Sequence, residues 1–149
     1  MDIDVRKLKF SGKDRLDFSF DYQLEEDLLL IPNAVIDGCI NVNGTLELHG
    51  DDVYVDGTVG CKIVGECARC LGKASTDFSA EMSVTFVRDN PNDDEDEYLY
   101  TSGVVNLRQA VKDVFLTNCP PVIYCNENCK GLCPICGNNL NEKDCNCKY

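Results

Sequence analysis

The sequence predicts an α+β protein that is mostly β, with an antiparallel sheet or partly open barrel built on one long hairpin. Three observations lead to this fold class. Two long segments alternate between apolar and polar residues, one segment has apolar residues at helical spacing, and seven of the eleven cysteines fall within residues 119–149. Alternation with a period of two is typical of a strand with one buried face, whereas spacings of three and four are typical of a helix. We therefore expect a β-rich domain with one helix over residues 1–118 and a cysteine-rich tail over residues 119–149.

Three short segments before the hairpin are candidate strands. They are Val5–Phe10, Leu16–Tyr22 and Asp27–Ile31, each rich in β-branched, aromatic or aliphatic residues. Segments of this length and composition between turn residues are typical of strands.

The long hairpin covers residues 34–67. Even-numbered positions carry the apolar face over residues 34–48, and odd-numbered positions carry it over residues 53–67. Residues 49–52, His-Gly-Asp-Asp, supply the turn between the two arms. Gly44 leaves two alternatives open within the first arm, a turn at Asn43-Gly44 or a β-bulge.

Two further elements follow the hairpin in the β-rich domain. Ser79–Arg88 has apolar residues on one face and is expected to return to the sheet. Residues 89–97 hold six carboxylates and no base, so we expect a solvated, mobile loop there rather than a packed element.

The one predicted helix follows Asn106. Asn106 can cap it, Gln109 stands at the capping-box position, and Cys119-Pro120-Pro121 should end it. The apolar residues of its buried face are expected to pack against the sheet. They are Leu107, Ala110, Val111, Val114 and Phe115.

Composition and charge exclude several classes of protein. With 149 residues, a net charge of −12 and a pI near 4.3, the chain is unsuited to coating nucleic acid or anionic membrane through bulk charge. It has no apolar segment long enough to span a membrane, and residues 1–6 lack the features of a signal peptide. We therefore expect a cytoplasmic protein. Disulfides are rare in the reducing cytosol, and eleven cysteines cannot all be paired in disulfides.

The tail has the residue pattern of a metal site. Cys133-Pro134-Ile135-Cys136-Gly137 has the form of a zinc knuckle, in which two thiolates meet on one side of a tight turn. Zn²⁺ accepts four thiolates, and a closed four-cysteine site is structural rather than catalytic, although an iron–sulfur cluster is an alternative. Spacing leaves open which four of six cysteines bind. The six are Cys125, Cys129, Cys133, Cys136, Cys145 and Cys147.

Cys67-Ala68-Arg69-Cys70 admits three interpretations. It is a thioredoxin-like redox pair, a half-site that cysteines elsewhere complete, or a packing motif with Arg69 exposed. Redox chemistry of this kind requires a helix N-terminus after a strand, whereas this pair ends a hairpin arm. The isolated Cys39, Cys61 and Cys119 are expected to be packing residues. No catalytic constellation or phosphate loop is found, so the sequence predicts neither an enzyme nor a small-molecule substrate.

These two cysteine motifs together resemble the YceD family, the large ribosomal RNA subunit accumulation proteins. The resemblance rests on Cys67-Ala-Arg-Cys70-Leu71 and on Cys129-Lys-Gly-Leu-Cys133-Pro-Ile-Cys136-Gly within the tail, and it extends over essentially the whole chain. It implies a non-enzymatic factor that supports accumulation of large-subunit ribosomal RNA, and hence ribosome biogenesis. Some family members lack the tail cysteines, which implies that the metal site is not needed for the shared role.

The charge distribution bears on the partner. The tail has as many acidic as basic residues, so we do not expect it to bind RNA strongly. The acidic body favours a basic partner, such as a ribosomal protein or a pre-ribosomal particle. Residues 1–15 carry five bases against three acids, so Lys7 and Lys9, together with Arg69, are candidate contacts to RNA or to a protein partner. The alternatives are therefore a direct RNA-binding protein and a thiol redox or metal-trafficking protein that uses Cys67 and Cys70.

Overall fold

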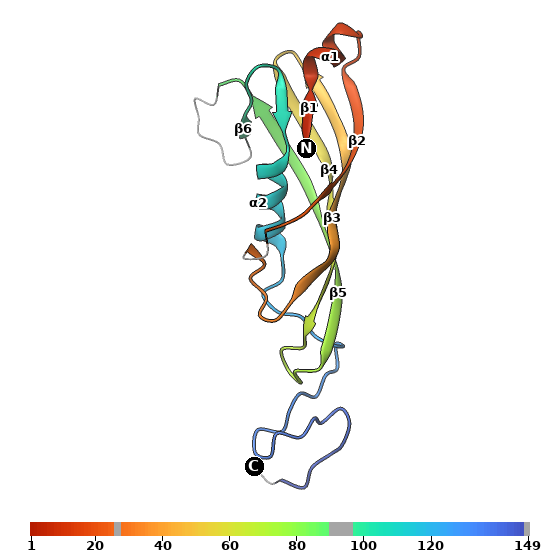
Figure 1. Cartoon of the computed structure of the whole chain (residues 1–149), viewed down its shortest axis with the longest axis vertical. Coiled ribbons are helices and arrows are strands. Elements are labelled where there is room, and N and C mark those ends of the chain that lie inside the picture. Colours follow the sequence, from red (N-terminus) through yellow and green to blue (C-terminus); the bar gives the residue numbers. More distant parts are fainter. Residues whose placement is uncertain (26–27, 90–96, 148–149) are drawn as a thin grey trace.

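The computed structural model describes residues 1–25, 28–89 and 97–147. They form an elongated molecule in which long strands run along the main axis and the C-terminal tail extends beyond one end of the sheet (Figure 1). The elements in chain order are β1 (Asp2–Asp4), α1 (Val5–Phe10), β2 (Arg15–Tyr22), β3 (Val35–His49), β4 (Asp52–Glu66), β5 (Lys73–Val87), β6 (Glu97–Leu99), β7 (Val104–Asn106) and α2 (Arg108–Asn118).

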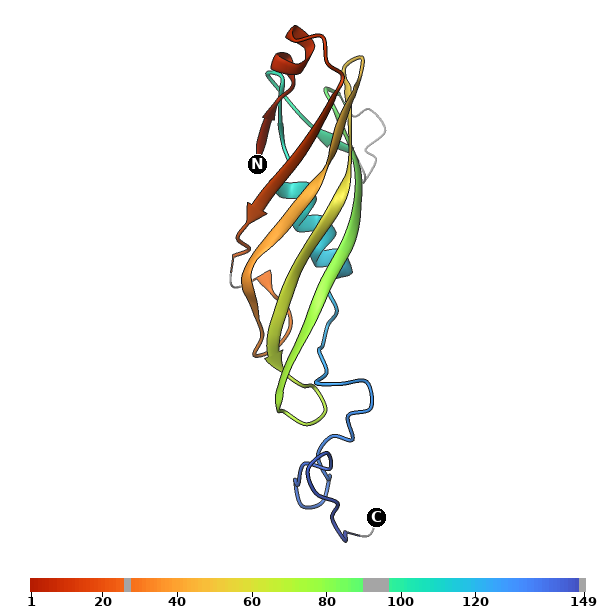
Figure 2. The same ribbon diagram turned by 90° about the vertical axis from the view of Figure 1, so that its right-hand side faces the viewer.

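The main sheet has five strands in the order β2-β3-β4-β5-β6. Its first four strands are antiparallel neighbours, and the short β6 pairs in parallel with the end of β5. β1 and β7 form a separate two-stranded sheet. The described sheet is open rather than closed into a barrel, and the turned view in Figure 2 shows its strands side by side with α2 behind them.

The predicted hairpin is confirmed, together with the face that it buries. β3 and β4 pair along almost their whole length, with Val42, Leu46, Val55 and Val59 fully buried. α2 covers this inner face, and the ring of Phe115 lies edge-on to the ring of Phe78, with 5.1 Å between centroids. The expectation that the predicted helix packs on the sheet is therefore confirmed.

Gly44 is neither a turn nor a bulge. It stays in the β3–β4 ladder directly opposite Gly57, and a Cβ on Gly44 would lie 2.8 Å from the Cα of Gly57 and 2.9 Å from the Phe18 ring. The two strands approach closely here, and the ring of Phe18 fills the space over the glycine. The irregularity in the ladder lies instead between Asp37 and Asn41.

Two of the three short strand predictions are wrong. Val5–Phe10 is helix α1, which begins where the Asp4 side chain accepts a hydrogen bond from the Arg6 backbone N–H and which buries Val5 and Leu8. Within Asp27–Ile31, the described residues 28–31 take part in no strand pairing. The prediction of a strand at Leu16–Tyr22 is confirmed as β2.

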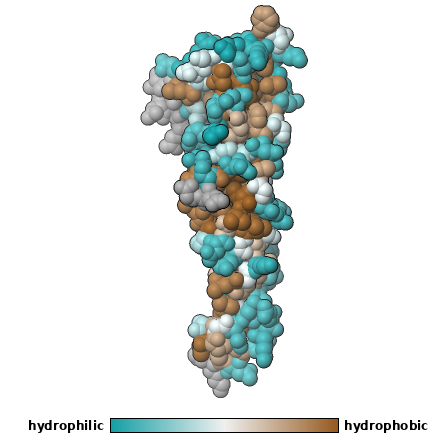
Figure 3. Space-filling view, in the orientation of Figure 1, coloured by the Kyte–Doolittle hydropathy of each residue, from teal (hydrophilic) through white to brown (hydrophobic). Residues whose placement is uncertain are grey.

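The apolar residues of the segment 28–31 pack against the rest of the molecule although they form no strand. Ile31 is buried, while Leu28 and Leu30 line a shallow pocket together with Leu116 at the C-terminal end of α2. Figure 3 shows a patch of hydrophobic residues in this middle part of the molecule, and further hydrophobic residues toward both ends.

The later elements differ from the predictions mainly in their bounds. β5 begins six residues before Ser79, where the inner positions include Ala74 and Thr76, whose side chains give little hydrophobic signal. Asn106 accepts a hydrogen bond from the Arg108 N–H as expected, but the Gln109 side chain donates to Asp113 instead of closing a capping box. Most of the predicted acidic loop, residues 90–96, lies outside the described residues.

Candidate metal centres

The end of the β4–β5 hairpin positions the first pair of cysteines. Cys67 follows β4 on its buried face, and the chain then turns tightly, with the Leu71 N–H donating to the Cys67 carbonyl at 2.9 Å. Leu71 has a φ of 58°, the left-handed conformation that such a turn requires. The turn places the sulfur atoms of Cys67 and Cys70 on the same side.

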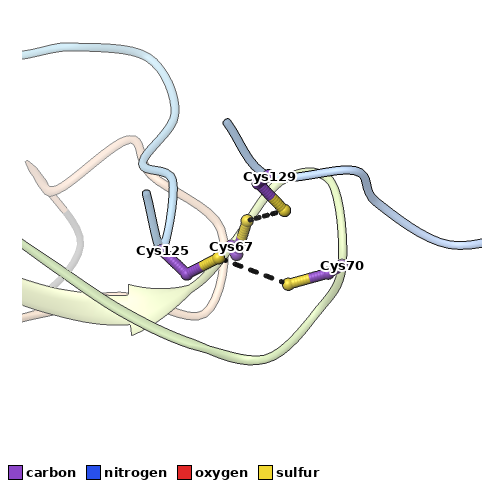
Figure 4. Close-up of side chains that lie close together, drawn as sticks. All are labelled: Cys67, Cys70, Cys125 and Cys129. Carbon is purple, nitrogen blue, oxygen red and sulfur yellow. Dashed lines mark hydrogen bonds between the residues drawn. The ribbon is translucent and has the colours of Figure 1, made fainter. Parts of the chain in front are cut away.

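The segment after α2 brings the second pair to the same place. The Ala68 N–H donates to the Ile123 carbonyl at 2.9 Å, which holds this segment against the hairpin end. Cys125 and Cys129 follow directly. Their sulfur atoms point toward those of Cys67 and Cys70, as Figure 4 shows.

The first cluster therefore joins parts of the chain that are far apart in sequence. Its members are Cys67, Cys70, Cys125 and Cys129, and their four sulfur atoms lie within 4.8 Å of one another. The Sγ–Sγ distance is 3.7 Å both for Cys67–Cys129 and for Cys70–Cys125. Four thiolates around Zn²⁺ with bonds of about 2.3 Å stand about 3.8 Å apart in a tetrahedron. The cluster has the dimensions of a four-thiolate metal site.

The second cluster is built from the tail alone. Its members are Cys133, Cys136, Cys145 and Cys147, whose sulfur atoms also lie within 4.8 Å of one another. The turn of the first cluster recurs here, with the Gly137 N–H donating to the Cys133 carbonyl at 2.9 Å and Gly137 at a φ of 73°. Glycine adopts this conformation without strain, whereas Leu71 in the first turn does not.

Arg69 connects the two clusters. Its guanidinium lies over the ring of Tyr124, 4.5 Å from the centroid, and donates to the carbonyls of Glu127 and Cys129 at 3.2 and 3.3 Å. Its own carbonyl accepts from the Leu132 N–H at 3.1 Å, just before the second cluster begins. Arg69 is exposed, yet its polar groups contact this chain.

Asparagine side chains support the sulfur atoms, and the sequence predicted no role for them. The Asn141 amide donates to the Cys129 sulfur at 3.3 Å, and its oxygen accepts from the Lys130 N–H at 2.8 Å. The Asn126 amide donates to the Cys125 sulfur at 3.3 Å. Donors of this kind orient and stabilise thiolates around a metal. The only signal was the place of Asn141 among the tail cysteines.

Ionisation of the thiols is uneven within each cluster. Burial raises the pKa of Cys67, but backbone N–H groups that face its sulfur outweigh this effect and bring the pKa to about 6. The neighbouring sulfur of Cys129 raises the pKa of Cys125 to about 12. In the second cluster, backbone N–H groups lower the pKa of Cys133 to about 6, and the pKa of Cys147 is raised to about 12. Sulfur atoms this close repel a further negative charge, and a bound divalent cation removes that repulsion.

The three remaining cysteines lie outside both clusters. Cys61 belongs to the core, and burial raises its pKa to about 11. Cys119 is half-buried against the core, and Cys39 is half-buried beside the irregular part of β3.

The two candidate lysine contacts lie far from the clusters. Lys7 and Lys9 are on α1, at the opposite end of the molecule from the tail (Figure 1). Lys9 forms an ion pair with Asp51, with 3.0 Å between Nζ and Oδ1. The structure therefore does not bring the lysines together with Arg69. None of the described helices is both long enough and apolar enough to cross a membrane.

Comparison with known proteins gives relatives that match about two thirds of the chain. An uncharacterized protein of Mycobacterium leprae is 29% identical over 106 residues, which cover 68% of this chain and 49% of the relative. An uncharacterized protein of Mycobacterium tuberculosis strain H37Rv is 29% identical over 97 residues, covering 62% and 47%. The chain thus spans about half the length of the curated relatives it matches. No solved structure matches significantly.

A family model gives the remaining comparison. The model described as large ribosomal RNA subunit accumulation protein YceD matches residues 55–149. This range is more than half of the chain and contains all eight clustered cysteines. The chain therefore belongs to the YceD family of large ribosomal RNA subunit accumulation proteins.

Proposed function

We propose that this chain is a non-enzymatic, cytoplasmic factor in the accumulation of large-subunit ribosomal RNA. It acts as a binding or adapter protein, and each of its two four-cysteine clusters holds one structural zinc ion. The family name supports the role in ribosome biogenesis. The main support for a structural zinc ion is the first cluster, in which four sulfur atoms from the hairpin end and from the segment after α2 lie together.

The donor set fits zinc in a structural role. Each cluster offers four thiolates and no oxygen or nitrogen ligand, so a tetrahedral ion has no open position for water or substrate. Zn²⁺ has no redox chemistry, and all eleven cysteines of the structure are free thiols, as a reducing compartment would keep them. When bound, the metal supplies folding free energy rather than chemistry.

The proposed partner is a basic protein, such as a ribosomal protein within a pre-ribosomal particle. The net charge of −12 favours such a partner over bare RNA, since like charges repel at long range. Two of the three bases of α1, Arg6 and Lys9, are already paired with Asp4 and Asp51, which weakens the case for an RNA contact at that end.

Metal analysis of the purified chain tests the zinc assignment. We expect two zinc ions per chain by elemental analysis and native mass spectrometry. The matched variants Cys67→Ser/Cys70→Ser and Cys133→Ser/Cys136→Ser should each lose one ion, and Cys39→Ser should keep both. Bound iron, or zinc that leaves without structural change, would overturn the structural assignment in favour of a cluster protein or a metal carrier.

A deletion strain tests the cellular role. Removal of the gene should lower the ratio of large- to small-subunit ribosomal RNA, and the intact chain should restore it. An unchanged ratio after deletion would refute the role, whatever the metal content. Direct RNA binding is tested separately, because it predicts an affinity for ribosomal RNA fragments that falls steeply with salt.

A further inference from the structure

The outer edge of β5 is an open strand edge. β6 pairs with β5 only at residues 85–87, so no described strand lies beside residues 73–84 on that side (Figure 2). The described backbone contacts outside the regular ladders also leave residues 74–84 without a partner there. Alternate backbone N–H and C=O groups along this edge therefore face solvent, which makes the edge a template for another strand.

The edge lacks three of the features that usually protect such strands, namely a bulge, a proline and a lysine. The β4–β5 register runs without a bulge from Val53 opposite Phe86 to Glu66 opposite Lys73. Residues 74–84 contain no proline and no lysine. Bulges, prolines and edge lysines prevent strand addition, and other charged side chains do so too. The two charged residues of this edge, Asp77 and Glu81, are both acidic, so they disfavour an acidic strand but not a basic one.

Two exposed carboxylates stand on this edge. Asp77 and Glu81 are exposed on the same face of β5, with Lys62 of β4 opposite Asp77 in the ladder, and among the described residues neither carboxylate forms a hydrogen bond or an ion pair. The other edge strand differs. On β2, Asp17 accepts a hydrogen bond from Thr45 at 2.8 Å, and Asp21 accepts one from an asparagine of β3 at 2.7 Å.

We propose that the β5 edge from Asp77 to Ser83 docks an extended, lysine- or arginine-bearing segment of a partner protein by strand addition. This inference rests on the proposed function, since it specifies where an adapter of this family would hold its basic partner. Backbone hydrogen bonds of the added strand would supply affinity, and side chains at alternate positions would supply specificity.

The positions of the carboxylates define the segment that fits. Asp77 and Glu81 stand four residues apart, about 13 Å along the strand, so basic residues in the partner need the same spacing. Positions of the added strand that face inward would lie beside Phe78, Ala80 and Met82, whose side chains are buried. The partner segment is therefore one in which basic residues alternate with apolar or hydroxyl residues.

A synthetic peptide tests the proposal on the full, zinc-loaded chain. The probe is a nine-residue peptide in which lysine or arginine alternates with threonine or valine, and the control peptide has glutamate at the basic positions. We expect the basic peptide to slow hydrogen exchange of every second amide within residues 74–84, because the intervening amides are already paired with β4. The glutamate peptide should leave all of these amides unchanged.

Matched variants separate the two edges of the sheet. Asp77→Asn/Glu81→Gln should weaken binding roughly threefold to thirtyfold, the loss expected for two exposed ion pairs. Asp17→Asn/Asp21→Asn changes two carboxylates at the same spacing on β2 and should leave binding unchanged within about twofold. Equal losses in the two variants, or slowed exchange without the alternating pattern, would overturn the proposal.

Two further outcomes also count against it. Sedimentation that shows a dimer with the same amides protected would assign the edge to a second copy of the chain. Failure of the peptide experiment refutes the edge proposal alone, because the ribosomal RNA ratio in the deletion strain tests the cellular role without it.

Discussion

Removing two ligands from the first cluster should destabilise the whole sheet, whereas removing two from the second should affect only the tail. The paired changes are Cys70→Ser/Cys125→Ser and Cys136→Ser/Cys145→Ser, which delete half of each cluster. Cys70 and Cys125 are 55 residues apart, and their link closes a loop that includes β5 and α2. The second link closes only the short loop 137–144 within the tail.

The expected size follows from loop closure. If the metal constrains the unfolded chain as a covalent link does, a loop of 55 residues is worth about 4 kcal/mol, and the short tail loop about 2.5 kcal/mol. For a chain of this size, 1 kcal/mol shifts the unfolding midpoint by roughly 2–4 °C. The first variant should therefore unfold about 8–16 °C below the parent, with the loss located in the sheet.

Thermal unfolding followed by far-ultraviolet circular dichroism measures this difference, with zinc and a reductant present. The signal reports the strands, so the second variant should keep the midpoint of the sheet within about 2 °C of the parent. Cys39→Ser/Cys119→Ser is the control, since both residues lie outside the clusters. Equal midpoint losses in the two cluster variants, or a first variant as stable as the parent, would refute the argument.

Three smaller predictions concern single positions. Gly44→Ala should lower the free energy of unfolding by about 1–3 kcal/mol or more in a denaturant titration, because its Cβ would lie 2.8 Å from the Gly57 Cα; a neutral result would contradict the close approach of the strands. In Gly137→Ala the added Cβ would meet no atom within 4 Å, but alanine would have to adopt a φ of 73°. The zinc affinity of the tail should therefore fall roughly fivefold to thirtyfold in a chelator competition, and the affinity of the first cluster should not change. The hydrogen bond and charge of Arg6 lower the pKa of Asp4 from 3.8 to about 2. The ionised Asp4 carboxylate therefore stabilises the fold fully at pH values above the pKa of the unfolded chain, and this stabilisation is lost as the pH falls toward 2. Asp4→Asn should abolish this pH dependence of stability. A measured pKa near 3.8 for Asp4 in the folded chain would disprove the prediction.

Much of the sheet follows from the sequence because its signal is local. The two arms of the hairpin alternate over many residues, and a strand with one buried face requires that alternation. α1 was assigned wrongly because six residues are too few for a decisive pattern. Leu8 and Phe10 are two apart, as in a strand, but the buried residues Val5 and Leu8 are three apart, as in a helix, and Asp4 caps the N-terminus.

The membership of the two cysteine clusters could be predicted only in part from local sequence patterns. The spacing within each cysteine pair is local, so all eight cysteines were candidates from the sequence. Which pairs combine depends on where the segment after α2 returns, and that is set by the contact between Ala68 and Ile123. The sequence therefore identified Cys67 and Cys70 as one candidate half-site. It did not show that Cys125 and Cys129 belong to a different cluster from the other four tail cysteines.

The 55-residue separation of Cys70 and Cys125 has a consequence for synthesis of the chain. A ribosome adding about 5–20 residues per second takes roughly 3–11 s to pass from one cysteine to the other. During that interval Cys67 and Cys70 have left the peptidyl-transferase centre without the partners that complete their cluster. The four-cysteine cluster can therefore be completed only after α2 has been synthesised, because α2 precedes Cys125 in the chain.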